Sequence, residues 1–233
     1  MQCATIASMT REEAIRSHIP YFDEMGPLQN EILHSVVLEH AVRGESIHRA
    51  GETCKGTIVI VTGLVRAYSD LAERKELTLY RLSSYDMCLF SASCTFRQPG
   101  VQISLEADED TDYLVIPTPL FMKMQNAVPS FAKLVSDIMQ ERFADIFTLL
   151  GDILTKKLPT RLASLLLEEA TRCTGDEIAI TQDRLASHLG SAREVVTRTL
   201  KYLQDEGLIT IGRGQITIRN RAGLEKLAAS EQL

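Results

Sequence analysis

The chain has 233 residues, 45% of them hydrophobic, which is enough for the cores of one large or two modest domains. Its five cysteines are irregularly spaced and do not make a disulfide framework. No apolar run approaches the roughly 20 residues of a membrane helix, and the N-terminus lacks the pattern of a secretory signal. We therefore expect a soluble cytoplasmic protein with no membrane contact.

The net charge of −6 is unevenly divided along the chain. Residues 156–233 hold 12 Lys and Arg against 10 Asp and Glu, a net of +2, whereas residues 1–155 carry a net of −8. An acidic first part joined to a slightly basic second part is compatible with a local nucleic-acid contact in the second part.

The first half of the chain predicts a β domain. An irregular lead and a short helix are expected within residues 1–20, and residues 28–40 have the apolar spacing of a helix. Between residues 42 and 117 glycines separate short segments rich in β-branched residues. The predicted strands are 46–48, 57–61, 64–68, 77–82, 101–107 and 113–116. Many short strands with turn residues between them indicate an antiparallel barrel or sandwich.

A long helix is predicted from Pro129 to about Thr155. Its apolar residues alternate four and three positions apart, which is the heptad spacing of a helix that pairs with a twin. The predicted dimer interface consists of Val135, Met139, Arg142, Ile146, Leu149 and Ile153. A second stripe is expected to lie on the chain's own domains, and it consists of Leu134, Ile138, Phe147, Leu150 and Leu154. The alternative is an ordinary buried helix in a monomer.

The stretch from Thr181 to Ile209 predicts two short helices joined by a tight turn, after a helix at 160–172 and a strand at 178–180. Thr181 is the expected cap of the first helix, and Gly190 is its expected end. Ser191 and Glu194 have the spacing of a capping box at the start of the second helix. In that helix one face is apolar, formed by Val196, Leu200 and Leu203.

Downstream, Gly207 is expected to close the second helix. Residues 209–218 alternate apolar and polar side chains on both sides of Gly212-Arg213-Gly214, which predicts a two-stranded wing. The whole is a winged helix-turn-helix, whose second helix would enter the major groove of double-stranded DNA.

The polar face of the second helix carries groups that can read base edges. Arg193 and Arg198 can donate pairs of hydrogen bonds to guanine, and Glu194 can accept one from cytosine. The expected contacts with the DNA backbone are Thr181, Ser191, Thr197, Lys201 and Arg213. The alternative is that Glu194 and Arg198, four residues apart, only stabilise their own helix.

Two stretches resemble the CRP/FNR family of bacterial transcription regulators. They are GESIHRAGETCKGTIVIVTGLVRAY in the β region and LASHLGSAREVVTRTLKYLQDEGLI in the helix-turn-helix. The resemblance implies an α+β fold with an N-terminal antiparallel β-barrel of the cyclic-nucleotide-binding-like jelly-roll type. A long dimerisation helix and a C-terminal winged helix-turn-helix follow. The corresponding domains are 1–126, 127–156 and 157–233.

The same resemblance implies a transcription regulator and not an enzyme. It places Arg193, Glu194 and Arg198 at the three base-contacting positions of the family. It further implies a homodimer on a near-palindromic site with half-sites about 34 Å apart, and RNA polymerase as a partner. DNA binding would be controlled by an effector or redox signal at the barrel.

Two cofactors of the family are disfavoured by the residues present. Cyclic-nucleotide-binding members carry a Gly-Glu-x-Ala/Gly-Leu cassette and an Arg-Ser/Thr-Ala, where this chain reads YDMCLFSA at 85–92 and VQISL at 101–105. A cyclic nucleotide would bury its phosphate there without the arginine, although Arg97 lies nearby in sequence. Iron-sulfur members need several N-terminal cysteines, and only Cys3 precedes Cys54.

The barrel keeps a candidate effector or redox site formed by Cys54, Met87, Cys88 and Cys94, with His48 as a possible neighbour. Such groups can form a thiol switch, hold a soft metal or ligate haem, and their cofactor is left open. Buried cysteines are also common inert core residues, and an uncharged organic effector is compatible with either view.

Two functions from other classes stay open as alternatives. One is a thiol or metal redox protein using Cys88 and Cys94, for which no companion catalytic residues are evident. The other is a ligand-binding module that acts on a protein partner through the long helix.

Overall fold

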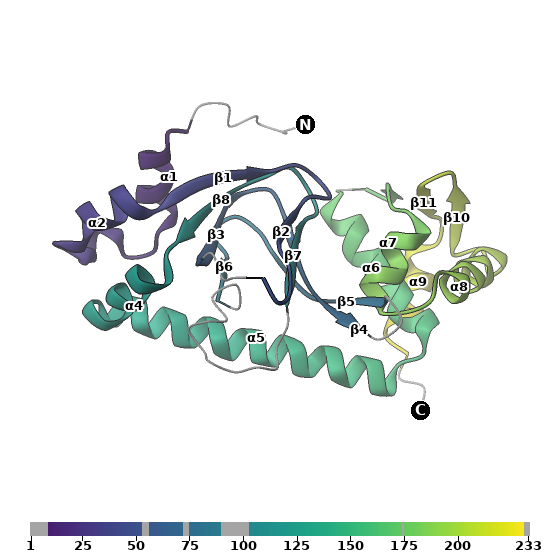
Figure 1. Ribbon diagram of the computed structural model, residues 1–233. Helices are drawn as coiled ribbons and strands as arrows, with labels where there is room; N and C mark the ends of the chain where they lie inside the picture. The colour runs from purple at the N-terminus through teal and green to yellow at the C-terminus, as the bar shows by residue number, and fades with distance from the viewer. Residues whose placement is uncertain (1–8, 53–55, 72–74, 90–102, 174, 231–233) are drawn as a thin grey trace. The chain divides into compact units, whose positions relative to one another are not determined.

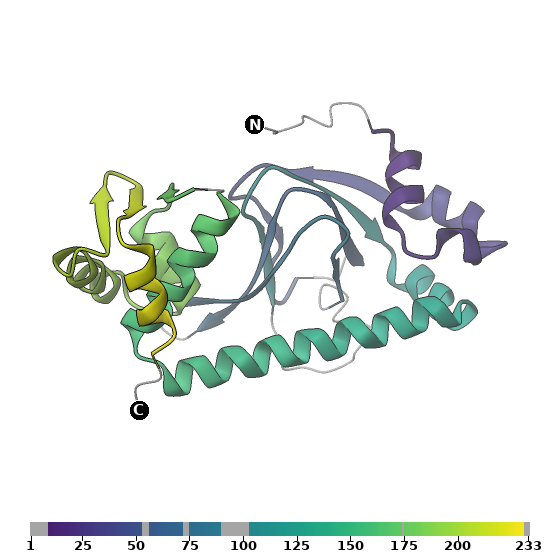
Figure 2. The same cartoon turned by 180° about the vertical axis from the view of Figure 1, so that it is seen from behind.

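The computed structural model describes residues 9–52, 56–71, 75–89, 103–173 and 175–230. The chain forms two compact units, one of residues 1–69 and 79–144 and the other of residues 70–78 and 145–233. Helix α5 (Pro129–Thr155) runs unbroken from the first unit into the second (Figures 1 and 2). The units thus divide within α5, and the three-part division at 126 and 156 stays a prediction. No helix in the described ranges is long and apolar enough to cross a membrane.

In the described residues, two four-stranded sheets form most of the first unit, with strand orders β1-β8-β3-β6 and β2-β7-β4-β5. The paired strands run antiparallel, as the sequence predicts. The strands are β1 (Val37–Ala41), β2 (Ser46–His48), β3 (Thr57–Thr62), β4 (Val65–Leu71), β5 (Lys75–Leu82), β6 (Met87–Cys88), β7 (Ser104–Ala107) and β8 (Thr111–Ile116).

Alternating side chains divide the first unit into two cores. Inward residues of both sheets, among them Ile58 and Leu105, form the barrel core between the sheets. Outward residues of the first sheet, among them Val59 and Leu114, meet the helices in a second, helix-side core. Those helices are α1 (Arg11–His18), η1 (Phe22–Met25), α2 (Leu28–Ser35), α4 (Thr118–Ala127) and the start of α5. This arrangement confirms the predicted α+β barrel.

The predicted helix at 28–40 needs a correction. Helix α2 ends at Ser35, and β1 begins two residues later at Val37. The change of structure follows from pairing with β8, in which Val37 stands opposite Val115. Local apolar spacing could not show this pairing, because the partner strand lies far along the chain.

In its described residues the second unit contains the end of α5, four further helices and a three-stranded sheet of order β10-β11-β9. Its core is fully buried at Leu166, Leu185, Leu200 and Leu224. The elements are α6 (Leu158–Arg172), β9 (Glu177–Ile178), α7 (Gln182–Leu189), α8 (Arg193–Asp205), β10 (Ile209–Gly212), β11 (Gln215–Ile218) and α9 (Arg221–Ala228).

Candidate functional site

Helix α7 begins and ends where the sequence predicts. The hydroxyl of Thr181 accepts a hydrogen bond from the backbone N–H of Arg184 at 3.2 Å and caps the helix. Gly190 follows the last turn with φ +62°, in the left-handed region that favours glycine. The tight turn between α7 and α8 therefore depends on this one residue.

The start of α8 differs from the prediction. Its N-cap is Ala192, without a side-chain hydrogen bond, and the expected capping box of Ser191 and Glu194 does not form. Ser191 instead completes the end of α7, since its backbone N–H donates to the carbonyl of Ala186 at 3.1 Å. The helix consequently begins one residue later, and Glu194 lies too close to the cap to fold back on it.

Helix α8 separates apolar from polar side chains by face. Val196, Leu200 and Leu203 are fully buried in the core of the second unit, as predicted. The polar side chains on the remaining face are exposed, namely Arg193, Glu194, Thr197, Arg198 and Lys201. The Nε of Arg198 donates to the backbone carbonyl of Glu194 at 3.4 Å. An exposed row of charged groups over a fixed apolar stripe can be presented to a ligand in one orientation.

Two polar contacts brace α8 against the first turn of α7. The hydroxyl of Thr197 donates to Oε1 of Gln182 at 2.6 Å. The guanidinium of Arg193 lies 3.3 Å from the carboxylate of Asp183. Sequence reasoning missed Gln182 and Asp183, because only the crossing of the two helices shows which polar residue of α7 meets α8.

The wing is present as predicted. Strands β10 and β11 pair antiparallel, with Gly212 opposite Gln215 and the exposed Arg213 at the tip. Oε1 of Gln204 in α8 accepts a hydrogen bond from the backbone N–H of Ile211 at 3.0 Å. This contact fixes the wing to the helix, so that both can meet one ligand together.

Known proteins share this architecture. Residues 160–227 match the Crp-like helix-turn-helix domain. A solved structure from Eubacterium rectale, assigned to the Crp/Fnr family of transcriptional regulators, is 36% identical. That match covers 92% of this chain and 100% of the other, with a TM-score of 0.87. The chain belongs to the CRP/FNR family. It is therefore a DNA-binding transcription regulator and not an enzyme.

Two curated relatives come from Thermus thermophilus. The transcriptional regulator SdrP is 28% identical over 177 residues, which are 73% of this chain and 83% of that protein. The cyclic AMP receptor protein is 25% identical over 186 residues, which are 80% of this chain and 85% of that protein. Both matches extend beyond the helix-turn-helix into the first unit of this CRP/FNR chain.

The structure corrects part of the predicted dimer seam on α5. Val135 is 5% exposed in the helix-side core, and Met139 packs against that core. Arg142 lies 3.4 Å from the carboxylate of Asp86 and over the ring of Tyr80. These three side chains face the chain's own first unit, which the sequence could not show because both stripes of α5 are apolar. Half-buried Ile146, Leu149 and Ile153 stay predicted interface residues.

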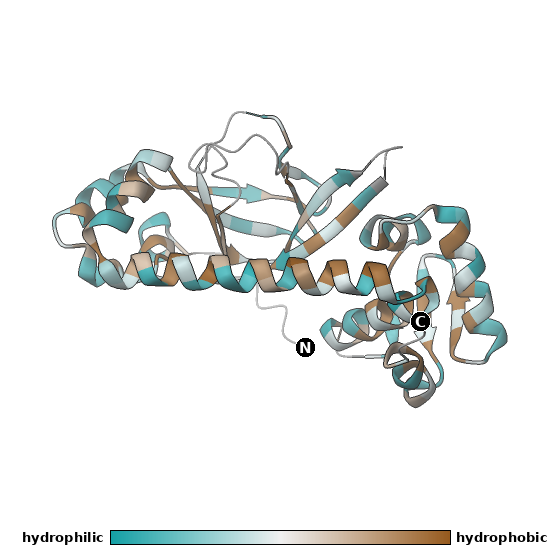
Figure 3. Cartoon of the chain, turned by 90° about the horizontal axis from the view of Figure 1, so that it is seen from below, coloured by the Kyte–Doolittle hydropathy of each residue, from teal (hydrophilic) through white to brown (hydrophobic). Residues whose placement is uncertain are grey.

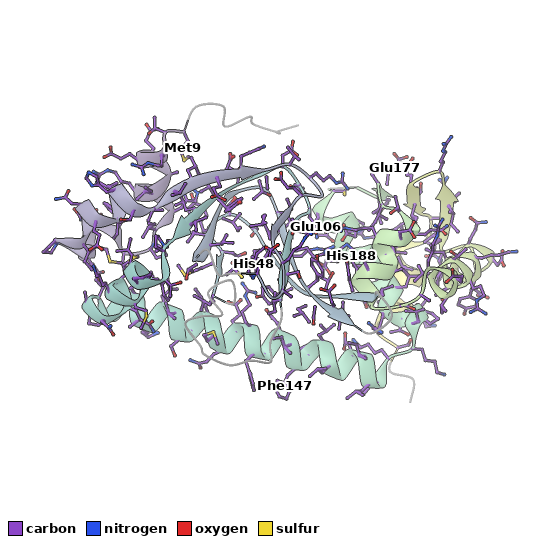
Figure 4. All side chains as sticks on the ribbon, viewed as in Figure 1. Met9, His48, Glu106, Phe147, Glu177 and His188 are labelled. Atoms are coloured by element: carbon purple, nitrogen blue, oxygen red, sulfur yellow. The ribbon has the colours of Figure 1, made fainter. Side chains whose placement is uncertain are left out.

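The second half of the neighbouring stripe of α5 is exposed, contrary to the prediction that the stripe lies on the chain's own domains, whereas Ile138 in its first half packs against the helix-side core as predicted. The exposed fractions are 64% for Phe143, 57% for Phe147, 46% for Leu150 and 83% for Leu154. Figure 3 shows hydrophobic and hydrophilic residues alternating along this helix, and Figure 4 shows Phe147 projecting away from it. Four large apolar side chains at spacings of four, three and four residues form a continuous exposed row, which we call the outer seam.

The barrel residues proposed as one site are separated. Met87 is buried in the helix-side core, whereas Cys88 is buried in the barrel core with its Sγ 3.9 Å from the hydroxyl of Tyr80. Adjacent residues of a strand point to opposite faces, so these two cannot share a pocket. Cys54 and Cys94 lie outside the described residues. Among the residues that are described, no group of three or more His, Cys, Asp or Glu is placed to hold a metal ion.

Proposed function

We propose that this regulator binds a near-palindromic DNA site as a homodimer, with α8 in the major groove of each half-site. Arg193, Glu194 and Arg198 contact base edges in this proposal. The phosphate contacts come from Thr181, Ser191, Thr197, Lys201 and Arg213. An effector or redox signal acting on the first unit would alter DNA binding through α5.

The observation that carries the proposal is the exposed polar face of α8 above its fully buried apolar stripe. A recognition helix needs polar side chains that are exposed to the groove and a backbone that packing holds in place. The contacts from Gln182 and Asp183 to α8, together with Gln204 to the wing, supply this rigidity. Arg213 on the wing and Lys201 on α8 add positive charge suited to phosphates.

The outer seam supports the homodimer. Phe143, Phe147, Leu150 and Leu154 repeat with heptad spacing and expose most of a large apolar area to solvent. A second copy of α5 would cover this row by the symmetric pairing that two-fold dimers use. We therefore propose the outer seam as the centre of the dimer interface, with Ile146, Leu149 and Ile153 flanking it.

The chemical identity of the effector stays open. Cys88 is 1% exposed and surrounded by the barrel core, which favours an inert thiol in this conformation. The side chain of His48 is also buried in the first unit. Haem, a thiol reaction and an uncharged organic ligand can be separated by an absorption spectrum of the anaerobically purified protein and by DNA binding with and without reductant.

The DNA proposal is tested by selecting binding sites from random duplexes and measuring affinity for the selected sequence. We expect Arg198→Ala to weaken specific binding by roughly 1–3 kcal/mol and to relax the choice at one base pair. Lys201→Ala, a matched loss of one cation on the same helix, should weaken specific and random DNA alike and lower the salt dependence. An equal loss for Arg198→Ala on both kinds of DNA would refute its role in reading bases.

A further inference from the structure

A contact within the second unit joins the first half of β5 to the end of α7. The hydroxyl of Thr78 lies 2.8 Å from Nδ1 of His188, at hydrogen-bonding distance. The neighbouring residues, Leu77 and Leu189, pair as an isolated antiparallel β-bridge. We call these two contacts the β5 clasp. Thr78 and His188 are 110 positions apart in the sequence.

The clasp is largely closed to solvent. Leu77 is 8% exposed, His188 7% and Leu189 5%. The carbonyl of Leu189 also accepts a hydrogen bond from the Arg161 guanidinium of α6 at 2.8 Å. Burial lowers the pKa of Arg161, and the nearby carboxylate of Asp152 opposes that shift. Three elements therefore meet at the last turn of α7, and polar groups without partners there would be costly to bury.

The clasp lies in a chain segment that connects the two units. Residues 70–78 belong to the second unit, while β4 before them and β5 after them continue into the first. The second unit is thus connected to the first by this β segment as well as by α5. Its contact point is the end of α7, next to the Gly190 turn that positions α8.

We propose that the β5 clasp orients the helix-turn-helix for specific DNA binding, a role that rests on the proposed function. A contact at His188 and Leu189 restrains α7, and the bonds from Gln182 and Asp183 carry the restraint to α8. His188 lies on α7 in Figure 4. Restraining a binding surface before it meets its ligand reduces the entropy lost on binding.

The clasp leaves the polar face of α8 open. Arg193, Glu194 and Arg198 are all exposed while Thr78 and Leu77 contact α7. Thr181 at the start of α7 is exposed as well. Loosening the clasp is therefore expected to weaken specific binding.

The clasp itself is tested by hydrogen exchange in the full-length protein. Thr78→Val keeps the shape and strand preference of the side chain but removes its hydroxyl. Losing about one hydrogen bond should speed amide exchange over residues 185–190 roughly fivefold. Thr171→Val is the matched control, since the hydroxyl of Thr171, at an exposed position of α6, donates to the Leu167 carbonyl at 2.9 Å. Equal exchange at 185–190 in wild type and Thr78→Val would show that the clasp does not restrain α7.

The functional role is tested on the selected DNA site. Thr78→Val should weaken specific binding up to about fivefold, the full value of the lost bond, while Thr171→Val should not. Unchanged or tighter binding by Thr78→Val would overturn the orienting role. If the wild-type protein selects no sequence at all, the proposed function fails, and the exchange result still decides whether the clasp exists.

Discussion

The outer seam of α5 gives the most direct test of assembly. Phe147 lies in the middle of the exposed row, with Phe143 before it and Leu150 and Leu154 after it. Phe147→Glu would place two carboxylates against each other in a symmetric dimer, where each would lose water without gaining a partner. Because the side chain is more than half exposed in the single chain, the substitution should leave the fold of the monomer intact.

The size of the effect follows from the exposed area. A phenylalanine can bury about 150–250 Å², and 57% of Phe147 is exposed. At about 25 cal/mol per Å², covering that part stabilises the dimer by roughly 2–4 kcal/mol per copy. Because Phe147→Glu removes this burial from both copies, it should destabilise the dimer by roughly 4 kcal/mol or more, which corresponds to at least about a thousandfold weaker dimerisation.

Sedimentation equilibrium over a range of concentrations measures this change. The matched control is Thr148→Glu, which adds the same charge one residue further along α5, about 100° around the helix, on an exposed position. We expect the control to dimerise like wild type and Phe147→Glu to be monomeric at micromolar concentration. A dimer of undiminished affinity in Phe147→Glu would remove the outer seam from the interface.

Two further predictions concern stability. Burial is the main cause of the lowered pKa of His18, which hydrogen bonds to Ala14 and Val61 oppose, so the folded chain binds its proton less readily than the unfolded chain. The free energy of unfolding should therefore fall as the pH drops through about 6.5. Measured by urea unfolding, this fall should be smaller in His18→Gln. An equal change of unfolding free energy with pH in both proteins would contradict this. Gly190→Ala should cost about 1–2 kcal/mol in thermal unfolding because of its positive φ, whereas Gly151→Ala, where a Cβ meets nothing within 4 Å, should cost nothing.

The features that sequence predicted correctly depend on a few adjacent residues. Thr181, Gly190 and the wing around Arg213 are local signals of caps and turns, and the structure has each of them. The buried stripe of α8 is equally clear from the sequence, since Val196, Leu200 and Leu203 share one face of a helix whose other face carries charged residues. The order of β domain, long helix and winged helix-turn-helix also follows from the residues, and the resemblance to the family rests on it.

The features that sequence missed depend on distant partners. The strand at Val37 needs β8, and the clasp at Thr78 needs α7. Which stripe of α5 is free to form a dimer interface depends on which one the first unit covers. Because both stripes are apolar, the sequence does not distinguish them. The separation of Met87 from Cys88, in contrast, is predictable from the sequence, because neighbouring residues of a strand point to opposite faces.

The position of Arg142 shows how α5 can serve two purposes at once. An arginine interrupts the heptad spacing, and in a dimer seam its charge would be costly to bury. The structure turns it towards Asp86, whose Oδ1 meets Arg142 while its Oδ2 accepts hydrogen bonds from the backbone and hydroxyl of Ser83. The turn before β6 is thereby tied to one face of α5.

The outer seam lies on the next face of the same helix, and a helix cannot move one face without moving the other. In the proposed dimer, any displacement of the turn that carries Asp86 must shift Phe143 and Phe147 against the partner. We propose that α5 in this way couples the barrel to the dimer seam and to the entry into the DNA-binding unit, a coupling that altered effector control of DNA affinity in an Arg142 variant would demonstrate. Arg142→Leu would extend the apolar spacing of the seam, yet by this argument it should loosen control of DNA binding, because it removes the tie to the barrel and adds nothing to the outer seam.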